Sequence, residues 1–144
     1  MKGKFLLYAQ LVLLILLFYF GNFGKIFSNP SLAIIFIAGV FLALWAFYNL
    51  GLDTYTPFPE PKKEGKHVQN GAYKYIRHPM YAAIMAIGLA LLLSSATFVS
   101  AVIYLLLLYV LDTKASLEEE YLVKIHPAYK TYSQKTKKII PFVY

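Results

Sequence analysis

Long apolar segments without charged residues alternate along the chain with shorter polar ones. Residues 5–20 and 32–52 contain no Asp, Glu, Lys or Arg. A helix that crosses a bilayer needs about 20 apolar residues, and the second segment meets that length on its own. Lys2 and Lys4 precede the first segment, as basic residues do in a signal peptide, but no small-residue cleavage site follows it. We therefore expect it to remain as a membrane anchor.

A third uncharged stretch, 80–109, is thirty residues long. It is too long for one membrane helix and short for two full ones. The segment 94–97, with the sequence Ser-Ser-Ala-Thr, interrupts it and supplies turn and helix-capping residues. The pattern predicts a tight hairpin of two short helices at 79–93 and 97–112.

Together these segments predict an all-α, polytopic membrane protein with about four transmembrane helices in a single domain, 1–144. Of the fourteen Lys and Arg residues, Lys25 alone lies between the first two spans. Because basic residues concentrate in cytosolic loops, both termini and the segment 53–78 are predicted to be cytosolic. The segment 113–144 then faces the same compartment.

Composition agrees with lipid as the main solvent. The chain is 59% hydrophobic and only 15% charged, whereas soluble domains carry about 25% charged residues. The absence of cysteine excludes disulfides, thiolate nucleophiles, Cys-ligated zinc and iron–sulfur clusters. In so apolar a chain, the net charge of +7 points to anionic lipid headgroups, and we predict membrane lipids as partners rather than nucleic acid.

Several common sites of membrane proteins are missing from the sequence. The three histidines lie outside the predicted spans, which disfavours haem held between helices, and no span contains a Lys for a Schiff-base pigment. No Gly-x-Gly or His-Glu-x-x-His motif occurs, so neither a dinucleotide fingerprint nor that metal site is present. We predict no metal site.

Polar and aromatic residues cluster just before the third span. Pro79 is favoured at the first position of a helix, which places His78 just outside it. The free N–H groups of Met80 and Tyr81, with Arg77 beside them, would form a site for a carboxylate or phosphate. Such residues also anchor helices at membrane borders, and the composition fits both interpretations.

A second cluster follows the fourth span. Ser116 and the acidic residues after it predict a new cytosolic helix, which Pro127 should end. Lys114 and Glu118 are four residues apart and share one helical face, where they could hold an anionic and an ammonium group. Taken alone, this cluster favours the simpler interpretation, an acidic turn that stabilises its own helix.

Taken together, the two clusters resemble the isoprenylcysteine carboxyl methyltransferase family, whose wider relatives include bacterial membrane enzymes that methylate phospholipids and thiols. The resemblance covers about 65–142 and rests on these motifs: Gly71-x-Tyr73-x-x-x-Arg77-His78-Pro79-x-Tyr81, Glu118-Glu119-x-x-Leu122, Tyr129-x-x-Tyr132 and Pro141. It implies an enzyme that uses S-adenosylmethionine, with S-adenosylhomocysteine as product, and has no Rossmann domain.

The resemblance also implies site residues. Those expected to bind the cofactor, including two on the approach strand 65–68, are His67, Val68, Tyr73, His78, Pro79, Met80, Tyr81 and Glu118. Arg77 and Lys114 are the catalytic candidates, both for orienting the acceptor, and no general base is assigned. Lys114 stands where the family usually has Arg, which keeps the charge and loses the bidentate fork. A second departure from the family pattern is the segment 126–129.

The expected reaction moves a methyl group to a lipophilic acceptor (a carboxylate, a thiol or a lipid headgroup) that arrives from the bilayer. The segments 53–78 and 113–144 are expected to cover the cofactor. The short chain favours a prokaryotic inner or plasma membrane protein. Two alternatives stay open: an NADPH-dependent sterol-type membrane reductase and a non-catalytic membrane binding protein.

Overall fold

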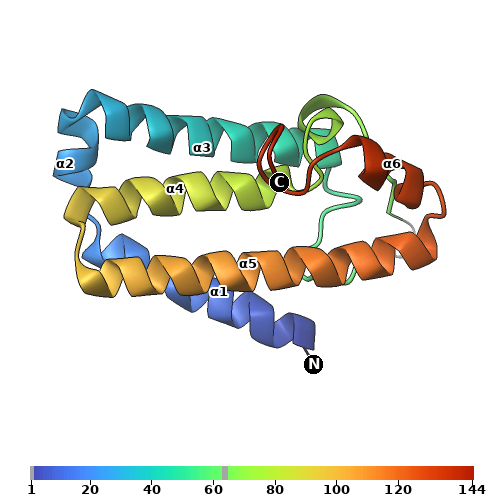
Figure 1. Cartoon of the computed structure of the whole chain (residues 1–144), viewed down its shortest axis with the longest axis horizontal. Helices are drawn as coiled ribbons and strands as arrows, with labels where there is room; N and C mark the ends of the chain where they lie inside the picture. The colour runs from blue at the N-terminus through green and yellow to red at the C-terminus, as the bar shows by residue number, and fades with distance from the viewer. Residues whose placement is uncertain (1, 63–64) are drawn as a thin grey trace.

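The structure, a computed structural model, describes residues 2–62 and 65–144. In these ranges it contains helices and no β-strand; two residues form one isolated bridge. Figure 1 shows the long helices side by side, with the short ones at the two ends of the bundle. The elements are α1 (Lys2–Phe20), α2 (Phe23–Ser28), α3 (Pro30–Leu50), η1 (Gly71–Lys74), α4 (Pro79–Ser95), α5 (Phe98–Ile125) and α6 (Tyr129–Lys135).

The outer surface of the bundle is apolar, which suits a lipid environment. α3 packs along α4, α1 packs along α5, and α4 also contacts α5. Buried leucines such as Leu17, Leu91 and Leu107 form the core between them. Large apolar side chains also cover the outside; Ile34 and Phe41, for example, are each about two-thirds exposed. In water such a surface would be unfavourable, whereas lipid tails solvate it.

Three of the helices, α1, α3 and α5, are long and apolar enough to cross a membrane. This confirms the all-α, polytopic prediction. α4 has 17 residues and is shorter than the other three, so a fourth crossing stays a prediction. The short helix α2, between the first two spans, was not expected from the sequence.

The helix boundaries follow local chemistry. Pro79 starts α4 with His78 as the preceding cap residue, as predicted. At the other end of α4, Ala96 takes the left-handed conformation and Thr97 caps α5, its hydroxyl accepting from the Ser100 N–H (3.1 Å). The hairpin turn at 94–97 is thereby confirmed.

One predicted boundary is wrong. α5 does not end near residue 112, and Ser116 does not start a separate helix, because α5 continues unbroken to Ile125. The Ser116 hydroxyl donates to the Asp112 carbonyl one turn earlier (3.0 Å). No Pro or Gly lies between these two residues, so nothing interrupts the backbone ladder. The helix ends just before His126 and Pro127, as expected.

The chain after α6 returns to the start of α4. The Arg77 and His78 N–H groups donate to the carbonyls of Lys137 (2.8 Å) and Lys138 (3.0 Å). The Lys138 ammonium donates to Asp112 Oδ1 of α5 (2.6 Å). The C-terminal segment 137–144 therefore ties the entry of α4 to α5. The approach strand expected at 65–68 is instead irregular chain.

Candidate functional site

A cavity of about 410 Å³ lies at the end of the bundle where α4 begins. This volume is in the range of small-molecule binding sites. Its walls come from α1, the end of α3, the connection between α3 and η1, the first turns of α4, the C-terminal half of α5, and the chain at and after its end. The site thus assembles segments that are far apart in the sequence.

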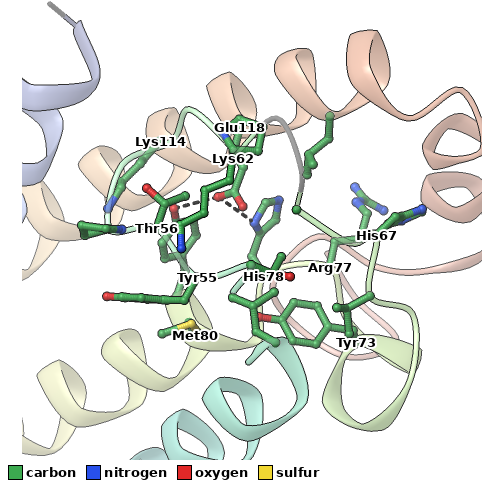
Figure 2. Close-up of a pocket in the computed structure, with 18 of the residues that line it drawn as sticks. Tyr55, Thr56, Lys62, His67, Tyr73, Arg77, His78, Met80, Lys114 and Glu118 are labelled. Carbon is green, nitrogen blue, oxygen red and sulfur yellow. Dashed lines mark hydrogen bonds and ion pairs between the residues drawn. The ribbon is translucent and has the colours of Figure 1, made fainter. Parts of the chain in front are cut away.

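A carboxylate stands in the middle of the cavity wall. The Tyr81 hydroxyl donates to Glu118 Oε2 (2.8 Å), and His78 Nδ1 lies 3.7 Å from the same oxygen. The His78 and Tyr81 rings stack nearly parallel, with centroids 5.3 Å apart. In Figure 2, Glu118 and His78 point toward each other near the centre of the view, joined by a dashed line. Glu118 is thereby fixed by α4 while it remains open to a ligand.

The neighbouring carboxylate, that of Glu119, binds other side chains of the protein instead of facing the cavity. Glu119 Oε1 accepts from Arg77 Nε (2.6 Å) and from His78 Nε2 (2.9 Å), and it does not line the cavity. Arg77 Nη1 also donates to the carbonyls of Ser133 (2.8 Å) and Thr136. The Arg77 guanidinium, which lines the cavity, is therefore engaged with the protein. Its expected part in orienting the acceptor stays a prediction.

The start of α4 offers fewer free amides than the sequence indicated. The Tyr81 N–H was expected to be free and donates instead to the His78 carbonyl (3.1 Å). Met80 lines the cavity as expected. Pro79 is fully buried and does not line it, so its contribution is to start the helix.

Lys114 occupies one end of the cavity. It is 2% exposed, and its ammonium donates to Gln10 Oε1 of α1 (2.8 Å). The ammonium also lies 5.3 Å from the centroid of the Tyr81 ring. Leu7 and Leu11 of α1, close to Gln10 in the sequence, also line the cavity. This end therefore combines a buried ammonium group with apolar side chains of α1.

The opposite end is aromatic. His67 lies there with Tyr73 nearby, far from Lys114 in Figure 2. The tight turn at Gly71 has a φ of 56°, and a side chain there would collide with Asn49, whose Oδ1 accepts from the Ala72 N–H (3.0 Å). Burial raises the pKa of the Tyr73 phenol well above its ordinary value, so the group stays protonated.

The predicted residues therefore meet at one place. Apart from Pro79, every predicted site residue lines this cavity, from His67 at one end to Lys114 at the other. The sequence model of the isoprenylcysteine carboxyl methyltransferase (ICMT) family matches residues 32–124. The chain belongs to the ICMT family. The match spans most of the cavity wall and includes Glu118. No curated protein and no solved structure matches the chain.

Membership of the ICMT family makes the chain a membrane protein of a methyltransferase family. The sequence motifs had placed Tyr129 and Tyr132 in the family pattern without assigning them to the cavity that they line. They had missed Gln10 altogether, although a lone amide in the apolar run 5–20 was a usable signal. Among the described residues, no group of three His, Asp or Glu side chains is placed to hold a metal ion.

Proposed function

We propose that this ICMT-family protein transfers a methyl group from S-adenosylmethionine to a lipophilic acceptor that enters from the bilayer. The observation that carries the proposal is the placement of the Glu118 carboxylate, between an aromatic end and a positively charged apolar end of one cavity. The proposal divides the cavity into a cofactor part and an acceptor part that meet near Glu118.

The residues present fit the cofactor. The amino-acid end of S-adenosylmethionine carries an ammonium group, which suits Glu118, and a carboxylate, which suits the first turn of α4 near His78. The adenine ring suits the aromatic end, beside Val68 and Tyr73. S-adenosylmethionine, when bound, supplies an electrophilic methyl group on a sulfonium.

The protein's own contribution is alignment and water exclusion. With S-adenosylmethionine bound, transfer would break the bond between the methyl carbon and sulfur, leave the electron pair on sulfur to give S-adenosylhomocysteine, and form a bond from the methyl carbon to an acceptor oxygen or sulfur. Tyr81 and His78 hold Glu118 in place, and Tyr55 and Thr56 line the cavity. An acceptor that arrives already anionic needs no general base, and alignment alone is worth several orders of magnitude in rate.

The acceptor end supports entry from lipid. Leu11 of α1 lines the cavity and is 44% exposed, and we place the outer face of α1 among the acyl chains of the bilayer. Lys114 is buried at the same end and favours an anionic headgroup over a neutral one. Among carboxylate, thiol and lipid-headgroup acceptors, all three remain within the proposal.

The decisive experiment is a titration of the purified protein in nanodiscs with S-adenosylhomocysteine, followed by calorimetry. We expect saturable binding by the wild type and a loss of about tenfold or more in Glu118→Gln, because removing a charge-assisted contact costs about 1.5–3 kcal/mol. Glu120→Gln is the matched control, since Glu120 is exposed. Absence of binding by the wild type, or unchanged affinity in Glu118→Gln, contradicts the proposal.

The acceptor is sought separately. Membranes incubated with the protein and S-adenosylmethionine should contain a lipid-soluble species that has gained the mass of one CH2 group, as seen by mass spectrometry. A preparation of the Glu118→Gln variant serves as the blank.

A further inference from the structure

The C-terminal segment 137–144 and the end of α6 enclose a second hollow, of about 340 Å³, on the surface of the molecule. It combines basic side chains with apolar and aromatic ones, among them Arg77, Lys135, Lys137, Lys138, Val143 and Tyr144. Arg77 lines both this hollow and the cavity. The other lining residues follow position 132, so they lie beyond the family-matched range 32–124.

The hollow carries a surplus of positive charge. After Glu120 the chain contains five lysines and no Asp or Glu. Arg77 and Lys138 are each paired with an acidic residue of α5, at 2.6 Å. Lys135 and Lys137 are exposed, and neither forms an ion pair within the described part of the chain. Two ammonium groups are therefore available to bind an anion.

An apolar turn projects beside the hollow. The Val143 N–H donates to the Ile140 carbonyl (3.2 Å), which closes a turn over Pro141 and Phe142. Phe142 has a φ of 64°, the left-handed conformation for which Gly or Asn is favoured at this position of a turn. Phe142 is 89% exposed and Val143 is 72% exposed. A large aromatic residue that strains the turn and gains little packing within the chain points to a contact outside it.

The place of the hollow along the bundle identifies that contact. The Lys138 ammonium and the Tyr144 hydroxyl both donate to Asp112 Oδ1, at 2.6 and 3.0 Å. Asp112 is the first charged residue of α5, so the segment lies where the apolar part of that helix ends. In Figure 1 the C-terminus lies beside the start of α4, where another apolar run begins. In a membrane, headgroups occupy this depth, with acyl chains next to them.

We infer that this hollow binds the phosphate of an anionic phospholipid, with Lys135 and Lys137 as cationic partners and the Phe142 turn among the acyl chains. Each lysine near an anionic leaflet is attracted to it. A zwitterionic headgroup also carries a phosphate, but its own ammonium group offsets that attraction. The apolar turn adds a contact that free phosphate would not make. The inference goes beyond the proposed methyl transfer and does not depend on it.

Native mass spectrometry of the detergent-purified protein tests the inference. The protein is offered equal amounts of phosphatidylglycerol and phosphatidylcholine with the same acyl chains, and we expect it to retain phosphatidylglycerol preferentially. Lys135→Gln and Lys137→Gln should each weaken phosphatidylglycerol binding about fivefold and leave phosphatidylcholine binding unchanged. Lys130→Gln is the matched control, because Lys130 is exposed on α6 like Lys135 but does not line the hollow.

Phe142→Asn tests the apolar turn. Asn tolerates the left-handed conformation, so the turn should survive while the apolar side chain is lost. We expect this variant to bind both lipids less tightly, by a similar factor. The lysine variants should melt at the same temperature as the wild type in phosphatidylcholine nanodiscs, where no anionic lipid is present.

Four results would overturn the inference. One is equal retention of the two lipids by the wild type. Another is retention of phosphatidylglycerol by a Lys135→Gln/Lys137→Gln double variant that matches Lys130→Gln. A third is displacement of phosphatidylglycerol by inorganic phosphate with unchanged retention in Phe142→Asn, since the hollow would then be a site for free phosphate. The fourth is a dimer that dissociates in Phe142→Asn, because the turn would then contact a second copy of the chain.

Discussion

The successive residues Glu118 and Glu119 make different contacts because neighbouring side chains on a helix point about 100° apart. Glu118 faces the cavity, whereas Glu119 joins Arg77 and His78 behind its wall. His78 is 5% exposed and contacts both carboxylates. The position of the cavity's central histidine therefore depends on a residue that does not line the cavity.

Replacing Glu119 tests this dependence. Glu119→Gln removes the charge that Arg77 and His78 share, and we expect the protein to lose about 1–3 kcal/mol of stability, as is typical when a buried charged partner is left unpaired. The melting temperature in detergent should fall, and S-adenosylhomocysteine should bind less tightly. Glu120→Gln, one residue further on at an exposed position, should change neither quantity. Equal melting temperatures in the two variants would remove Glu119 from this supporting role.

His67 should make stability depend on pH. Its folded-state pKa is lowered by burial and by the charge of His126, so the unfolded chain binds a proton more readily than the folded one. The stabilisation that comes from the neutral ring is fully present above the ordinary histidine pKa of about 6.5. It is lost as the pH falls from that value toward the lowered pKa of the folded state. Denaturation at pH 7.5 and 5.5 should show a larger drop for the wild type than for His67→Phe. Parallel profiles would exclude a contribution from His67.

At the scale of elements, the sequence predicts those features that depend on near neighbours. Pro79 and the turn at 94–97 mark helix ends through their own backbone chemistry, and the structure confirms both. Ser116 followed by glutamates has the same local pattern in a helix start and in a helix middle, so the continuation of α5 could not be read. The contact of Gln10 with Lys114 joins residues 104 positions apart, beyond any local pattern.

The C-terminal segment 137–144 should contribute to the stability of the site. Lys138 donates to Asp112 Oδ1 and to the Ser116 hydroxyl (2.8 Å), which holds the segment on α5 beside the start of α4. Lys138→Met should therefore lower the melting temperature and raise amide hydrogen exchange at Arg77 and His78, whose N–H groups donate to this segment. Lys137→Met, at an exposed position, is the control. Unchanged exchange in Lys138→Met would mean that the backbone contacts suffice.

For the whole molecule, the family match and the apolar helices agree on a membrane protein. The site is made at one end of the bundle because the starts or ends of α1, α3 and α4 and the C-terminal half of α5 lie there together. α2 lies at the opposite end. The distribution of basic residues predicts on which side of the membrane each end of the bundle lies, and cysteine labelling can test this.

Because the sequence contains no cysteine, single introduced thiols report accessibility without background. Lys25→Cys lies in α2, and Lys66→Cys lies at the wall of the cavity; both positions are exposed. In intact cells, a membrane-impermeant maleimide should label position 25 and spare position 66, because basic loops stay in the cytosol. Lys137→Cys should behave like position 66. Labelling with the opposite preference would invert the predicted topology.

Because α5 is unbroken, its length fixes the distance between its start and the cavity. From Phe98 to Glu118 it rises about 30 Å, at about 1.5 Å per residue, which equals the hydrocarbon thickness of a typical bilayer. With no flexible joint between the two points, the depth of Glu118 follows the lipid environment directly. We therefore predict that thinner membranes lift the carboxylate into the headgroup layer and that thicker ones draw it into the acyl chains. Activity should then depend on the acyl-chain length of the surrounding lipid.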